Sequence, residues 1–126
     1  MPTILVVDDD PGIRGLLDQT LRRKAYSVVF AADGDSGFDL FRRMSPDAVV
    51  LDLNMPGMDG MMLLEKVREL NERVPVIILT GPPMRELEHE ASLLGATAFL
   101  RKASSIHELG NVLKEALEKP AFRSAA

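Results

Sequence analysis

Acidic residues directly follow two short apolar runs of this sequence. Residues 8–10 are all aspartate and come after the run 4–7, while Asp52 comes after the run 48–51. Carboxylates that converge repel one another unless a cation is present. Carboxylate, backbone carbonyl and water oxygens together suit Mg²⁺, and a carboxylate can also attack phosphorus as a nucleophile. These residue types therefore indicate metal-assisted phosphoryl chemistry.

A hydroxyl and an amine follow two further apolar runs. Thr80 ends the fourth run, and Lys102 comes shortly after the fifth. A lysine and a hydroxyl can steady negative charge on the oxygens of a transferred phosphoryl group. Each residue alone has an ordinary explanation: aspartates after a strand form turns and N-caps, threonine belongs to strands, and lysine is solvated. Their joint position at the ends of four runs favours a common site.

The apolar runs predict the strands of a parallel sheet. They are continuous rather than alternating and are rich in β-branched residues, which suits strands covered on both faces. They span residues 4–7, 28–31, 48–51, 76–79 and, more weakly, 98–100. Ligands of an open α/β sheet bind beyond the carboxyl ends of its strands. The acidic residues, Thr80 and Lys102 are therefore expected at one edge.

Segments with helical periodicity separate these runs. Their apolar stripes are Ile13, Leu16, Leu17 and Leu21; Phe38, Leu40 and Phe41; Leu63, Leu64, Val67 and Leu70; Met84, Leu87, Ala91 and Leu94; and Ile106, Leu109, Leu113, Ala116 and Leu117. The alternation predicts an α/β fold of five βα units, with helices on both faces of the sheet and right-handed crossovers. Met62 and Leu93 fall off their stripes, so they are expected at the surface, where either could mark a partner site.

Residues near the expected helix ends agree with this division. Pro11 suits a first helical turn, where its missing N–H costs nothing, and Asp10 is the expected N-cap before it. Gly95 can close the fourth helix. Ser105 with Glu108 matches a capping box.

Composition bounds the class of protein. The 126 residues allow one domain, expected over 1–120 with a tail at 121–126. The absence of cysteine excludes disulfides and thiolate zinc sites. Lys plus Arg is 15 and Asp plus Glu is 19, and the net charge of −4 argues against direct nucleic-acid binding. No apolar run approaches the ~18 residues of a membrane span, and the start lacks a signal peptide's basic region, so a cytoplasmic protein is expected.

Four motifs give the chain a family resemblance. They are ILVVDDD at 4–10, VVLDLNMPGMDG at 49–60, IILTG at 77–81 and GATAFLRK at 95–102. In this order and spacing they resemble the receiver domain of bacterial two-component response regulators, over about residues 3–119. The resemblance implies a doubly wound, flavodoxin-like five-stranded sheet with strand order 2-1-3-4-5.

The resemblance also implies a metal site. Asp9 and Asp52 would supply metal oxygens together with the backbone carbonyl of Asn54. Asp8 would hold a metal-bound water. The implied cofactor is Mg²⁺ or Mn²⁺.

The same resemblance implies a phosphorylation-dependent switch. Asp52 would accept a phosphoryl group from a sensor histidine kinase or histidine phosphotransfer protein, with Thr80 bonded to that group and Lys102 paired with it. Phe99 would reorient with Thr80. The surface of the fourth helix, fifth strand and fifth helix would then change, and would form a homodimer or dock a target. Such a domain phosphorylates and dephosphorylates itself rather than turning over a substrate.

Two departures from the family pattern carry structural predictions. The family usually has proline after the lysine, where this chain has Ala103. A cis bond before a non-proline residue costs about 2.5–4 kcal/mol, so the Lys102–Ala103 bond is predicted to be trans. The pair Pro82-Pro83 after Gly81 predicts a stiff loop where the family often moves.

Three other interpretations remain open at this stage. A Mg²⁺-dependent phosphoesterase would use carboxylates of the first strand, but here the isolated acid lies after the third. A binding module that signals without phosphate is left open by the residues around Lys102. The chain could also be the receiver part of a larger DNA-binding regulator.

Overall fold

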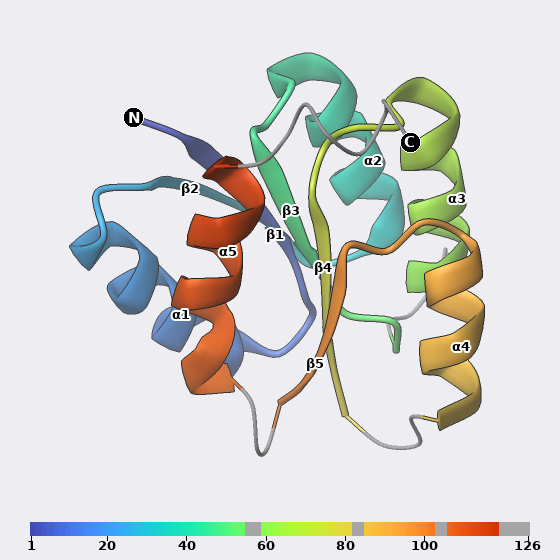
Figure 1. Cartoon of the computed structure of the whole chain (residues 1–126). Coiled ribbons are helices and arrows are strands. Elements are labelled where there is room, and N and C mark those ends of the chain that lie inside the picture. Colours follow the sequence, from blue (N-terminus) through green and yellow to red (C-terminus); the bar gives the residue numbers. More distant parts are fainter. Residues whose placement is uncertain (55–58, 82–84, 103–105, 119–126) are drawn as a thin grey trace.

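The structure is a computed structural model that describes residues 1–54, 59–81, 85–102 and 106–118 (Figure 1). Five predictions involve residues outside this set: the Lys102–Ala103 bond, the stiffness of Pro82-Pro83, the capping box of Ser105, the apolar role of Met84 and the tail at 121–126. They stay predictions. Among the described residues, no helix has the length and apolar character to cross a membrane.

Strands and helices alternate along the chain, as the periodicity predicts. The strands are β1 (Thr3–Val7), β2 (Ser27–Ala31), β3 (Ala48–Leu51), β4 (Val76–Thr80) and β5 (Ala98–Arg101). The helices are α1 (Pro11–Arg23), α2 (Gly34–Met44), α3 (Gly60–Leu70), α4 (Arg85–Leu93) and α5 (Leu109–Glu118), with a short 3-10 turn η1 (Ile106–Glu108) before the last. The predicted α/β class is confirmed.

The five strands form one parallel sheet in the order β2-β1-β3-β4-β5, which confirms the doubly wound arrangement. Helices α1 and α5 cover one face, and α2, α3 and α4 cover the other (Figure 1). The strands supply a separate core to each face: Ile4 and Val6 pack toward the α1 and α5 side, while Leu5 and Val7 pack toward the other. Burial of apolar side chains on both faces explains why the strand sequences are continuously apolar.

The ends of α1 and α4 follow the predicted chemistry. Asp10 is the N-cap of α1, and its carboxylate accepts the backbone N–H of Gly12 at 2.9 Å, with Pro11 as the first helical residue. Gly95 follows α4 with a φ of +99°, a conformation that favours glycine. Backbone bonds from Gly95 to Ser92 and from Ala96 to Ala91 close the helix.

Two of the stripe residues are exposed, contrary to prediction. Leu16 is 47% exposed and Leu70 is 57% exposed. At about 100° per residue, Leu16 lies at the margin of the arc that its helix turns toward the core, and Leu70 is the last residue of α3. The predicted exposure of Met62 and Leu93 is confirmed, at 51% and 74%.

Candidate functional site

The sheet register places the acidic residues at one edge. Val7 of β1 pairs with Leu51 of β3, so Asp8 and Asp52 directly follow paired residues of neighbouring strands. The backbone N–H of Asp52 donates to the carbonyl of Val7 at 2.9 Å and continues the ladder. Both carboxylates are consequently almost fully buried, at 2% and 3% exposure.

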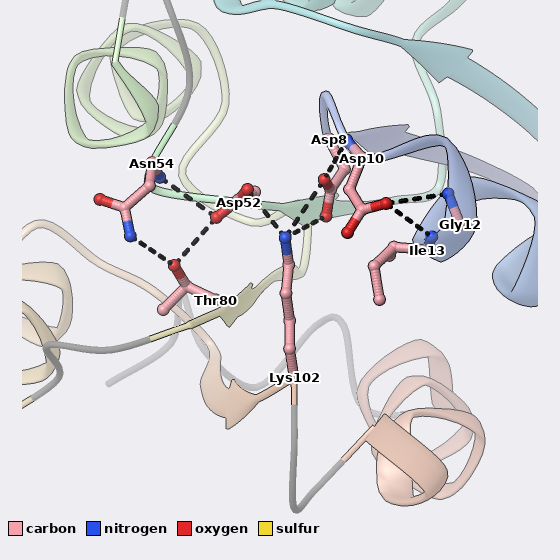
Figure 2. Close-up of polar contacts among 8 residues, drawn as sticks. All are labelled: Asp8, Asp10, Gly12, Ile13, Asp52, Asn54, Thr80 and Lys102. Atoms are coloured by element: carbon pink, nitrogen blue, oxygen red, sulfur yellow. Dashed lines mark hydrogen bonds and ion pairs between the residues drawn. The ribbon is translucent and has the colours of Figure 1, made fainter.

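Asp52 receives hydrogen bonds on both carboxylate oxygens (Figure 2). Its Oδ1 accepts the hydroxyl of Thr80 at 2.9 Å and the backbone N–H of Asn54 at 3.1 Å. Its Oδ2 lies 3.0 Å from the Nζ of Lys102. The structure thus brings together Asp52, Thr80 and Lys102, which the sequence assigned to one site.

Lys102 bridges two carboxylates. Its Nζ lies 3.0 Å from Oδ2 of Asp8 as well as 3.0 Å from Asp52. The backbone N–H of Lys102 donates to the carbonyl of Thr80 at 2.9 Å, which fixes the start of the side chain beside β4. Burial lowers the pKa of this amine, but the hydrogen bonds that it donates to Asp52 and Asp8 outweigh the effect of burial, and the net shift of the pKa is upward. The ammonium form is therefore the one that the site holds.

The surroundings of Asp8 disfavour its charged form, in contrast to those of Lys102. Burial raises the pKa of its carboxyl above the ordinary value, and the nearby charge of Asp52 adds to the rise. The backbone N–H of Asp10 and the amine of Lys102 act against it without cancelling it. The ionised form of Asp8 is thus held at a cost that an added cation would relieve.

Three carboxylates converge closely enough to share a metal ion. One oxygen each from Asp8, Asp9 and Asp52 lies within 4.8 Å of the others, and Asp9 is exposed while the other two are buried. In the described part of the site, these three negative charges face the one ammonium of Lys102. Such hard oxygen donors fit Mg²⁺, which keeps several waters and binds through one or two carboxylates.

Asp10 and Phe99, also singled out from the sequence, lie at the N-terminus of α1 and on β5. Asp10 turns its carboxylate toward the start of α1, as its N-cap role requires (Figure 2). Phe99 lies on β5, where it pairs with Ile78 of β4 and packs, partly buried, against the core on the α3 and α4 side.

Two contacts in the site were not anticipated from the sequence. The side-chain amide of Asn54 lies 3.5 Å from the hydroxyl of Thr80, although only its carbonyl was assigned a role. Gly60 lies against the backbone of Asp52: a Cβ there would be 2.3 Å from the carbonyl oxygen of Asp52. The one local signal for the second contact is an Asp-Gly pair immediately before a helical stripe.

Comparison with known families identifies the same region of the chain. The sequence profile of the response regulator receiver domain matches residues 4–114. Sporulation initiation phosphotransferase F of Bacillus subtilis (strain 168) is 35% identical over 114 residues, which cover 90% of this chain and 92% of that protein. The chain spans only 27–46% of the length of several matching transcriptional regulators, with 27% for GlrR of Escherichia coli (strain K12).

Solved structures agree with the architecture. A CheY-like response regulator receiver domain protein of Methanospirillum hungatei JF-1 superposes with a TM-score of 0.90 at 29% identity, covering 95% of this chain and 96% of that one. Response regulator TrrA of Thermotoga maritima, in complex with Mg(2+)-BeF, superposes with a TM-score of 0.83 at 29% identity, covering 92% of this chain and 99% of that one.

Proposed function

This chain belongs to the response regulator receiver domain family, and from that premise we propose that Asp52 is its phosphoacceptor. Receiver domains of two-component systems are phosphorylated by histidine kinases or by phosphotransfer proteins. The donor proposed here is accordingly a phosphohistidine on such a protein. A carboxylate oxygen of Asp52 forms the new O–P bond as the N–P bond to the imidazole breaks, and the imidazole leaves with the electron pair.

The observation that carries the proposal is the polarity of the Asp52 environment. The carboxylate is 3% exposed, yet a hydroxyl, an amide N–H and an ammonium all point toward it. Donors held this close to the carboxylate can stabilise charge that develops on the transferred group. In this proposal, Lys102 pairs with the phosphoryl oxygens, and Thr80 turns its hydroxyl from Asp52 to one of them.

The carboxylates beside Asp52 would hold a divalent cation. Asp9 and Asp52 are the proposed direct ligands with the carbonyl of Asn54, and Asp8 would bind a coordinated water. Support comes from the convergence of the three carboxylates within 4.8 Å and from the raised pKa of Asp8. TrrA was solved with Mg(2+)-BeF, and Mg²⁺ when bound would neutralise phosphoryl charge here.

The proposed output is a two-state change on the face formed by α4, β5 and α5. A ligand shifts such an equilibrium only through contacts that differ between the two states. Thr80 would change its partner from Asp52 to the phosphoryl group, and Phe99 on the adjacent strand would change position with it. A homodimer contact or target docking on that face would read the difference.

Intact mass after incubation with acetyl phosphate and Mg²⁺ tests the acceptor. We expect one added phosphoryl group, lost in Asp52→Asn and lost when EDTA removes the metal. Asp10→Asn is the matched control, because asparagine caps a helix about as well as aspartate and this residue turns away from the pocket. An adduct that survives in Asp52→Asn would refute the assignment. Absence of both an adduct and a beryllofluoride complex would favour a phosphate-independent binding module.

A further inference from the structure

A groove between α3 and α4 is the most distinctive surface that the phosphoacceptor site leaves unexplained. Both helices cover the same face of the sheet (Figure 1), and side chains from both line the groove. The groove has a volume of about 370 Å³ and is lined by the start of α3 and the end of α4. It is separate from the side of α4 that faces β5, where Glu88 and Ser92 line a different hollow with Phe99.

Apolar side chains on the two walls of the groove are open to solvent. Met62 on α3 is 51% exposed, and Leu93 on α4 is 74% exposed. Single exposed apolar residues are common, but these two line one hollow. Met61 and Leu94 continue the apolar surface inward, since both line the groove and pack against the core. Methionine is flexible and polarizable and adapts to different apolar partners.

The rim of the groove is acidic. Asp59, Glu65 and Glu90 line it, and none of the lining residues that the structure describes is basic. The last turn of α4 also carries no basic side chain. The groove therefore combines an apolar floor with negative charge on both walls.

The nearest cations of α3 are directed elsewhere. The guanidinium of Arg68 donates to the carbonyl of Gly95 at 2.9 Å and to that of Val74 at 2.6 Å, so it binds the segments that follow α4 and α3. The ammonium of Lys66 lies 5.4 Å from the ring centroid of Phe38, toward α2. The carboxylates of the groove thus remain available to cations from outside the chain.

We propose that this groove binds a basic amphipathic helix of a partner protein. Apolar side chains one turn apart on that helix would contact Met62 and Leu93, and lysines or arginines flanking them would pair with Glu65 on one wall and Glu90 on the other. A helix fits better than a strand because it presents one apolar stripe with charges on both flanks, which matches a groove with acidic residues on both walls. The interaction does not require phosphorylation of Asp52, which lies outside the groove.

A synthetic amphipathic peptide of leucine, alanine and lysine is the first probe, and the same peptide with glutamate in place of lysine is its counterpart. Each peptide is titrated into the isotope-labelled chain. NMR chemical shifts then locate the binding site, and calorimetry measures the affinity. We expect shifts at residues 59–65 and 90–94 and at least tenfold tighter binding of the lysine peptide. Leu93→Gln should weaken that binding about tenfold. Leu70→Gln is the control, because Leu70 is also exposed but lies on α3 outside the groove, and this variant should bind the peptide as the unaltered chain does.

Charge reversal gives the decisive comparison. In the double variant Glu65→Lys with Glu90→Lys, the preference should reverse toward the glutamate peptide. Equal binding of the two peptides to the unaltered chain, or shifts confined to other residues, would overturn the proposal. Self-association that Leu93→Gln abolishes, with no peptide binding, would overturn it in favour of a second copy of the chain. Acetyl phosphate labelling of the same variants separates this result from any failure at Asp52.

Discussion

At the residue scale, the site depends on a hydroxyl that occupies a fully buried position. Thr80 is 0% exposed and ends β4, so its backbone belongs to the sheet while its hydroxyl reaches Asp52. A buried hydroxyl needs a hydrogen-bond partner, and this one has a charged acceptor. The residue is therefore a strand residue and a site residue at once, which its sequence position alone leaves ambiguous.

Replacing that hydroxyl tests its chemical role separately from its packing. Thr80→Val keeps the branched shape and removes the donor. We expect the rate of phosphorylation by acetyl phosphate to fall about tenfold or more, with the free energy of unfolding changed by less than about 1.5 kcal/mol. Thr80→Ser retains a hydroxyl and should keep most of the rate. Equal rates in the valine and serine variants would exclude the proposed contact.

At the element scale, α3 begins in direct contact with the strand end that it follows. Asp59 caps the helix by accepting the N–H of Met62 at 2.9 Å. The N–H of Gly60 donates to the carbonyl of Leu53 at 3.2 Å, which closes the chain back on itself. The helix can start this close to Asp52 because its first residue has no side chain.

Two glycine-to-alanine changes in different helices make a matched pair. A Cβ at Gly60 would meet Leu53 Cα at 2.5 Å as well as the Asp52 carbonyl, so Gly60→Ala should lower the free energy of unfolding by about 1–3 kcal/mol. It should also slow phosphorylation, since the acceptor backbone must shift. Gly15 lies within α1 with nothing near its Cβ position, so Gly15→Ala should raise stability by about 0.5–1 kcal/mol. Urea titration of both variants measures the free energy of unfolding, which should fall in Gly60→Ala and rise in Gly15→Ala.

At the scale of the whole molecule, folding and the proposed cation site should be linked thermodynamically. Three strand ends and the segment after a fourth bring Asp8, Asp52, Thr80 and Lys102 to one edge, and the two aspartates are buried there. Folding therefore assembles negative charge that the unfolded chain keeps apart. A cation that binds only the folded state should stabilise it according to its affinity and concentration.

Substitution of Asp8 should reveal this linkage. Because burial raises the pKa of the Asp8 carboxyl, ionisation opposes folding, and Asp8→Asn should raise Tm in EDTA. Mg²⁺ at about 100 times its Kd should stabilise the unaltered chain by about 2.7 kcal/mol, and the same concentration should stabilise Asp8→Asn less. Thermal unfolding with and without Mg²⁺ measures both effects. An identical Mg²⁺ response in the two proteins would contradict a role for Asp8 in metal binding.

The sequence was sufficient to predict the elements and the edge at which chemistry occurs. Continuous apolar runs separated by helical stripes predict buried parallel strands, and the residue after each run must lie at the carboxyl edge. Asp8, Asp52 and Lys102 were therefore predictable at one edge, because strand direction is a property of the alternating pattern. The strand order that makes Asp8 and Asp52 neighbours was implied only by the family resemblance. The same local logic predicted the N-cap role of Asp10 and the helix-ending role of Gly95.

Only the tertiary structure shows which of these side chains bind one another and which are buried. Distance and burial depend on the register between strands, so the sequence could not show that Lys102 bridges Asp8 and Asp52 or that Asp9 stays exposed. Helical periodicity shows which side of a helix faces the core. It does not show how much of that side the neighbouring elements cover, which is why Leu16 and Leu70 were wrongly predicted to be buried. The acidic groove between α3 and α4 exists only because these successive helices both lie on one face of the sheet, where their side chains line a common hollow.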